Sequence, residues 1–155
     1  MLVAWREPEP ALRERNLALA LVGVGLANQS SSQVIRGYRL LNRMEKSFSN
    51  DPILLTSLGT VLMKAKEPAE AWKRFEKVVS LKPNSAPYRL NAATALVALE
   101  RPGEAIQQLQ SALVLDPLLQ PAVQLLAKLY RERGEVEKAD RLISGFWHAM
   151  GAPHH

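Results

Sequence analysis

The chain lacks cysteine and places all its histidines near one end, and these absences remove several classes of function. None of the 155 residues is cysteine, which excludes disulfides, thiolate metal sites, covalent haem attachment and cysteine nucleophiles. The three histidines are His148, His154 and His155, and no Asp or Glu is spaced to complete a metal-ligand set with the last two. The sequence therefore predicts neither a metal centre nor a bound cofactor.

Two short segments have the composition of functional loops but lack the surroundings that such loops need. Ser30-Ser31-Ser32 has no candidate base, so we expect it to form a capped turn between two helices. Gly23-Val24-Gly25 lies in an apolar stretch with no strand before it and no lysine after it, which argues against a phosphate-binding loop. We therefore predict that the chain is not an enzyme.

Long hydrophobic runs are also missing. The longest, Leu17 to Ala27, has eleven residues, too few to cross a bilayer core of about 30 Å as a helix. The segment before it carries Glu7, Glu9 and Glu14, whereas an export signal begins with a short basic stretch. The run is expected to be a buried helix, and the default location of the protein is the cytoplasm.

Against these absences stands one pattern that recurs at a constant interval along the chain. Its clearest markers are three evenly spaced alanines, Ala71, Ala105 and Ala139, and we call their spacing the repeat interval. Four residues after each alanine comes a bulky apolar residue: Phe75, Leu109 and Ile143. Three residues further on comes another apolar residue: Val78, Ala112 and Phe146. Twelve residues before each alanine lies a small residue: Gly59, Ala93 and Ala127.

This pattern resembles the tetratricopeptide repeat, a helix-turn-helix unit of about 34 residues in which small residues mark where its two helices cross closely. The resemblance implies an all-α fold, a right-handed superhelix of antiparallel helix pairs. It divides the chain into a linker over 1–16, a degenerate first repeat over 17–50, repeats over 51–84, 85–118 and 119–150, and a tail over 151–155. The first repeat is placed by stepping back one repeat interval, which assigns these core positions: Leu21, Val24, Gly25, Gly37, Leu41 and Met44.

Proline and glycine positions predict where the helices begin and end. Asp51-Pro52 is typical of a helix start, with a capping carboxylate and a proline at the first helical position. Breaks at Glu67-Pro68, Arg101-Pro102 and Arg133-Gly134 separate the paired helices. The sequence thus predicts eight helices of about 12 to 18 residues.

The resemblance also implies a function: a protein-protein interaction scaffold that binds a peptide in its concave groove. The family's inward-facing positions correspond to Thr56, Thr60, Met63, Lys64, Leu90, Thr94, Val97, Gln124, Lys128 and Arg131. This surface is apolar in the middle and basic toward its C-terminal end, which suits an extended or helical peptide with apolar anchors and an acidic flank.

Some members of the family bind acidic chaperone tails through a clamp of lysine, asparagine and arginine. In this chain Thr56 and Thr60 stand where the lysine and asparagine belong, and Pro121 and Leu125 replace the basic pair. A chaperone-tail adaptor is therefore not predicted.

Cations gather at helical spacing in the N-terminal part of the chain, at Arg36, Arg39, Arg43 and Lys46. Such a stripe can bind phosphate backbones or anionic lipids. Tyr38 lies nearby, but a solvated helix face has the same pattern, and there is no run of interleaved aromatic residues to stack bases. We favour the solvated face, so neither nucleic acid nor a membrane is a predicted partner.

The last predicted helix carries apolar residues with few expected partners: Leu142, Ile143, Phe146 and Trp147. A repeat array normally ends in a polar capping helix, so this surface predicts self-association or docking onto another subunit. In the alternative interpretation, Phe146 and Trp147 fold back on the preceding helix. The second functional hypothesis follows: a terminal module or accessory subunit of a larger enzyme or electron-transfer assembly.

Overall fold

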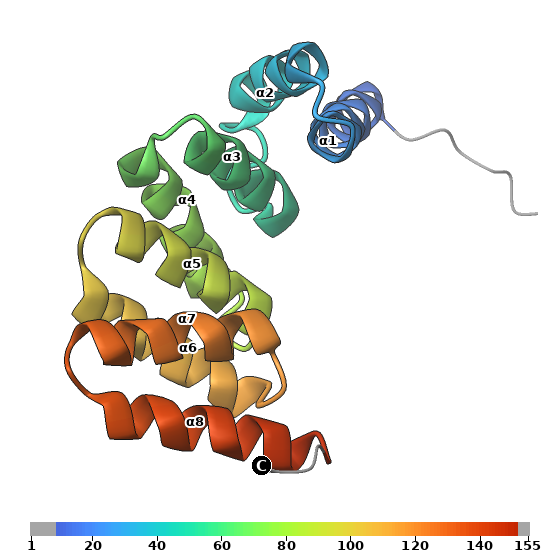
Figure 1. Cartoon of the computed structure of the whole chain (residues 1–155). Coiled ribbons are helices and arrows are strands. Elements are labelled where there is room, and N and C mark those ends of the chain that lie inside the picture. Colours follow the sequence, from blue (N-terminus) through green and yellow to red (C-terminus); the bar gives the residue numbers. More distant parts are fainter. Residues whose placement is uncertain (1–8, 152–155) are drawn as a thin grey trace, which may run out of the picture.

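The computed structural model describes residues 9–151, which form eight consecutive α-helices and no strand within that range (Figure 1). The helices are α1 (Pro10–Ala27), α2 (Ser31–Met44), α3 (Pro52–Lys64), α4 (Pro68–Leu81), α5 (Ala86–Ala98), α6 (Pro102–Leu115), α7 (Gln120–Glu132) and α8 (Val136–Ala149). Consecutive helices pair as hairpins, and the hairpins stack into an elongated, curved array. The predicted all-α solenoid of antiparallel helix pairs is confirmed.

Helix starts follow the local chemistry read from the sequence. The Asp51 carboxylate accepts hydrogen bonds from the backbone N–H groups of Ile53 and Leu54, at 3.1 and 3.3 Å, as predicted for the cap of α3. Ser30 precedes α2, but its side chain makes no capping hydrogen bond, so the predicted cap at this turn is wrong. Its hydroxyl lies 3.4 Å from that of Ser32 instead.

Every hairpin turn closes in the same way. The residue after the helix C-cap takes a left-handed conformation, with φ near +60° at Lys66 and Glu100 and +79° at Gly134. The next amide then reaches back five residues, so that the N–H of Glu67 donates to the carbonyl of Leu62 at 2.8 Å. These turns satisfy the carbonyls at the helix ends and confirm the predicted breaks between paired helices.

The repeated small residues lie where helices cross. Ala71, Ala105 and Ala139 are all fully buried. A Cβ atom added to Gly59 would lie 2.3 Å from the ring of Phe75, so only glycine lets α3 approach α4 this closely. The small residues recur at the repeat interval because each hairpin needs them where its two helices touch.

The first hairpin departs from the repeat interval. In the later hairpins, the first helices end one repeat interval apart: α3 ends at Lys64 and α5 at Ala98. Helix α1 ends at Ala27, and the distance along the chain from there to the end of α3 is three residues longer than the repeat interval. The extra three residues lie between α2 and α3, where seven residues, 45–51, connect the hairpins; the later connections, 82–85 and 116–119, have four. The predicted register of α1 is therefore wrong by three residues, and Val24, assigned to the core, is 49% exposed.

The start of α1 is a second correction. The helix begins at Pro10, so residues 10–16, predicted as linker, are helical. Proline suits the first turn of a helix, and Ala11 to Asn16 contain no residue that would break one. Residues 1–8 of the predicted linker, and the C-terminal His154 and His155, lie outside the described residues.

Two glycines hold the first hairpin together. Cβ atoms added to Gly25 and Gly37 would lie 2.8 Å from side-chain atoms of Val34 and Val22, respectively. The helices α1 and α2 can approach closely because both positions lack a side chain. Gly25, Gly37, Leu41 and Met44 are buried, so four of the six core positions predicted for this repeat do lie in the core.

Two arginine-carboxylate pairs tie the first hairpin to the second. The guanidinium of Arg15 in α1 donates from Nε and Nη2 to the Asp51 carboxylate, and the Nη2–Oδ1 distance is 3.0 Å. Arg74 in α4 donates in the same two-pronged way to Glu45, at 3.0 Å for each bond. Burial alone would raise the pKa of Asp51, but hydrogen bonds from Arg15 and the Leu54 amide outweigh it, and the pKa is lowered.

Candidate protein-binding surfaces

The residues predicted to line the groove come from α3, α5 and α7, which follow one another along the array in Figure 1. The exposed ones are Lys64, Thr94, Gln124, Lys128 and Arg131. The half-buried ones are Thr56, Thr60, Met63, Leu90 and Val97. Met63, Leu90 and Val97 also pack against the core clusters, so each offers only part of its surface to a partner.

Hydrogen bonds within the helices occupy several polar groups of this surface. The hydroxyls of Thr60 and Thr94 each donate to the carbonyl four residues earlier, at 2.9 Å. Lys128 lies 3.9 Å from Glu132, and Arg131 lies 3.6 Å from Asp140 on α8. Because these pairs are well exposed, their charges remain available to an acidic partner.

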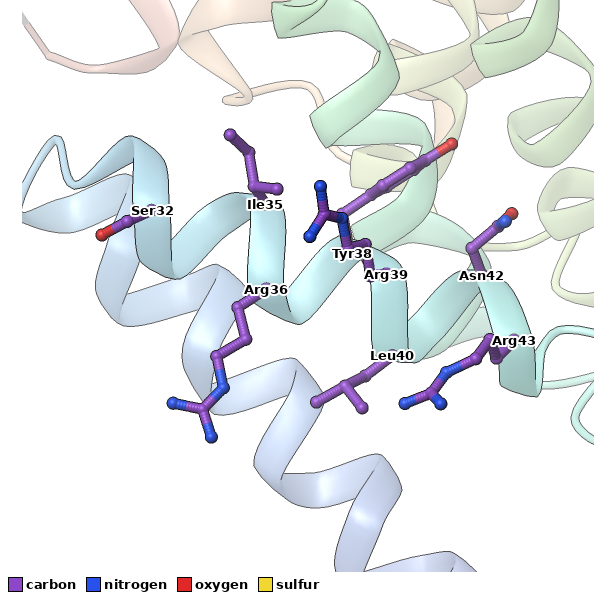
Figure 2. A pocket seen from close by; sticks show the side chains of 8 residues that line it. All are labelled: Ser32, Ile35, Arg36, Tyr38, Arg39, Leu40, Asn42 and Arg43. Carbon is purple, nitrogen blue, oxygen red and sulfur yellow. The ribbon is translucent and has the colours of Figure 1, made fainter.

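The predicted cation stripe borders an open pocket of about 890 Å³ formed by side chains of α2. Figure 2 shows Arg36 and Arg43 on one side of the helix with Leu40 between them, and Ile35 and Tyr38 on the other. Arg43 lies 3.7 Å from Glu14 of α1, and both side chains are largely exposed. The stripe is an exposed helix face crossed by apolar side chains, and its role as a solvated surface without a nucleic-acid or lipid partner stays a prediction.

A smaller pocket, missed by the sequence analysis, lies where the end of α1 and the start of α2 meet the C-terminal end of α3. Its volume is about 400 Å³, and Val34, Ile35, Val61 and Lys64 are among its lining residues. The corresponding corner between α4 and α5 is occupied by Trp72, on whose ring the Arg101 guanidinium stacks at 5.3 Å. Ile35 is smaller than Trp72 and leaves its corner open.

At the C-terminal end, the four predicted interface residues separate into two groups. Phe146 is only 7% exposed, and Leu142 packs against the core cluster formed with α6 and α7. Trp147 is 44% exposed, with its ring 5.3 Å from that of Phe146 in an edge-on arrangement, and Ile143 is half-buried. Ile143 and Trp147 border a pocket of about 260 Å³ together with Gln124 and Arg131.

Within residues 9–151, no three or more Asp, Glu or His side chains form a group that could hold a metal ion. In the same range, every helix is too short or too polar to cross a membrane.

These surfaces belong to helical hairpins repeated at a constant interval, and residues 62–118 match the family model of the tetratricopeptide repeat. The chain is a tetratricopeptide-repeat protein. The predicted family is thus confirmed, and the fold supports a role as a protein-interaction scaffold.

Two plant proteins in which such repeats accompany a thioredoxin are similar in sequence. The inactive TPR repeat-containing thioredoxin TTL3 of Arabidopsis thaliana is 37% identical over 93 residues, which is 60% of this chain and 14% of that protein. The TPR repeat-containing thioredoxin TTL4 of the same plant is 33% identical over 119 residues, 76% of this chain and 17% of that protein. The chain thus spans about a sixth of the length of these relatives.

Solved structures of MamA share the fold. A MamA mutant is 25% identical and superposes with a TM-score of 0.74, covering 88% of this chain and 75% of that one. A double mutant of MamA RS-1 gives a TM-score of 0.78 at 20% identity, covering 92% of this chain and 76% of that one. The shared fold therefore extends over most of the chain, beyond the part that the family model matches.

Proposed function

We propose that the chain is a non-catalytic scaffold that binds an extended or helical segment of a partner protein along the exposed sides of α3, α5 and α7. The observation that carries this proposal is the row of partly exposed apolar side chains, Met63, Leu90 and Val97, flanked by exposed cations. Side chains of this kind anchor a peptide in a groove, and the cations favour an acidic flank. Lys64 lies at one end of the row, and Lys128 and Arg131 lie at the other.

The burial pattern supports a scaffold. Within residues 9–151 no polar or charged residue is buried as a whole, and the two buried side-chain oxygens without a hydrogen-bond partner, Gln33 Oε1 and Thr56 Oγ1, belong to half-buried residues. An enclosed active site holds polar groups away from water to shift their reactivity. The described surfaces are open instead, which suits recognition of another chain.

A peptide screen tests the proposal. A displayed peptide library is selected on the full chain, and the affinities of selected peptides are then measured by titration calorimetry. We expect acidic peptides with apolar anchors. Lys128→Glu should weaken their binding by about tenfold, or about 1.4 kcal/mol, because it reverses a charge that faces the acidic flank.

The controls are chosen by position. Val114 on α6 is 83% exposed and lies outside the proposed groove, so Val114→Glu should leave binding unchanged. Trp147→Ala, at the end of the array, should also leave it unchanged. Equal loss of binding in Lys128→Glu and Val114→Glu, or selected peptides without acidic residues, would count against the groove.

A further inference from the structure

The first helix of each later hairpin packs one face against the hairpin before it. In α3 this face consists of Leu54, Leu58 and Val61. These side chains are at most 8% exposed and pack against α1 and α2. The equivalent residues of α7, two repeat intervals further on, are Ala122, Leu126 and Leu129. They are at most 2% exposed.

Helix α1 carries the same face without a cover. Aligning the end of α1 with the end of α3 places Leu17, Leu21 and Val24 at the equivalent positions, which we call the α1 face. All three are apolar, yet Leu17 is 52% exposed and Val24 is 49% exposed. The buried side of α1, at Ala18 and Val22, is already occupied by contact with α2. No element within residues 9–151 covers the α1 face.

Helix α8 carries the other half of this contact. At the seam between the second and third hairpins, α4 offers Phe75 and Val79 to α5. Two repeat intervals further on, the equivalent residues are Ile143 and Trp147, which we call the α8 face. These residues border the pocket of about 260 Å³ at the end of the array, a hollow large enough for an aliphatic side chain.

We propose that a second copy of the chain joins these two faces. The α1 face of one copy stacks on the α8 face of the next, head to tail, in the way that α5 stacks on α4 inside each chain. The proposal is based on the pairing of equivalent positions between the chain's own hairpins, where α4 offers Phe75 and Val79 to α5. This interaction uses faces other than the groove, although Gln124 and Arg131 of the groove border the same pocket as the α8 face.

The polar residues at the edge of the two faces agree with this pairing. Trp72 lies where α4 meets the turn of the following hairpin, close to Arg101. In α8, the residue equivalent to Trp72 is Asp140. In the proposed contact, Asp140 would meet the turn at residues 28–30 of the second copy, where Asn28 and Gln29 are exposed. A carboxylate and a polar turn are compatible neighbours, since each offers the other hydrogen-bonding groups.

The expected assembly is open-ended and weak. A head-to-tail contact leaves one free face at each end, so further copies can add. The contact involves few helices, and we expect less than the roughly 800 Å² per partner that a stable interface buries. Association should therefore increase with protein concentration.

Light scattering on the full chain across a concentration series tests this assembly, using variants that block one face each. Leu17→Asp with Val24→Asp blocks the α1 face, and Trp147→Asp blocks the α8 face. Val114→Asp is the matched control, an equally polar change at an exposed apolar residue away from both faces. Circular dichroism melts establish that all variants fold, as expected for substitutions at positions that are at least 44% exposed.

We expect the average mass of the wild type and of Val114→Asp to rise with concentration, and each blocked variant alone to keep the mass of one chain. An equimolar mixture of the two blocked variants should form a complex of two chains that grows no further, because it retains one working contact. The proposal is overturned if the wild type keeps the mass of one chain at every concentration. It is equally overturned if either blocked variant associates with itself, or if the mixture does not associate.

Discussion

The first hairpin and the three that follow it are joined to their neighbours in different ways. Between α4 and α5, Trp72, Phe75 and Val79 fill the seam with apolar side chains, and four residues make the connection. Between α2 and α3, the connection has seven residues, one corner is an open pocket of about 400 Å³, and two arginine-carboxylate pairs bridge the seam. The comparison teaches that a degenerate repeat can remain in an array through polar links where apolar packing is incomplete.

The largest expected effect comes from emptying the apolar seam of the regular part. Phe75 is 3% exposed, so Phe75→Ala should lower the free energy of unfolding by about 3–5 kcal/mol through lost burial and a residual cavity. Tyr38 is the residue of α2 at the same helix position, but it is only partly buried. Tyr38→Ala should therefore lower the free energy of unfolding clearly less than Phe75→Ala does. Urea unfolding followed by circular dichroism measures both. Equal losses would mean that the two seams are packed alike.

A smaller effect is expected from the polar link. Arg15→Gln removes the cation from Asp51, and both side chains are only 15% exposed, so the loss should be about 1–3 kcal/mol. Hydrogen exchange should become faster in α1 and α2 and stay unchanged in α7 and α8. Faster exchange throughout the array would show that the hairpins unfold as one unit and that the link is not local.

The same link predicts a dependence on pH. The pKa of Asp51 is lowered in the folded chain, so its contribution is complete above the unfolded-state value of about 3.9. As the pH falls below that value and through the folded pKa, the carboxylate becomes protonated and the contribution is lost. The wild type should thus lose its stability advantage over Arg15→Gln in acid, which urea unfolding at neutral and acidic pH measures.

The smallest effect is expected from filling the open corner. Ile35→Trp places at this corner the residue type that α4 uses at Trp72, and it should raise the free energy of unfolding by about 0.5–2 kcal/mol. Ile53→Trp is the matched control, since Ile53 is 55% exposed and does not line the pocket. If both variants raise the free energy of urea unfolding equally, the stabilisation does not come from filling the pocket.

The sequence could predict features that depend on neighbouring residues in the chain. The spacing of Ala71 and Ala105, the capping by Asp51 and the breaks at Glu67-Pro68 and Arg133-Gly134 each reflect a local steric or hydrogen-bonding requirement. Such requirements leave their residue types at fixed positions. The family, the helix pairs and most of the core could therefore be predicted without coordinates.

Features decided by contacts across the array could not be predicted in this way. The three additional residues before α3 lie in a connection with no periodicity, so stepping back by one repeat interval misplaced Val24 in the core. Phe146 and Trp147 are adjacent and both apolar, yet only Phe146 finds a buried place, because the helix turns the two side chains in different directions. The groove residues and the α1 and α8 faces remain predictions for binding experiments.

By itself, the sequence determined that this chain forms helical hairpins repeated at a constant interval, because each hairpin depends on small residues, turns and caps close together along the chain. Only the tertiary structure decided how the first hairpin attaches and which apolar surfaces stay uncovered. Those outcomes depend on which side chains meet between hairpins: Ile35 stands where the next hairpin has Trp72, and it lines an open pocket.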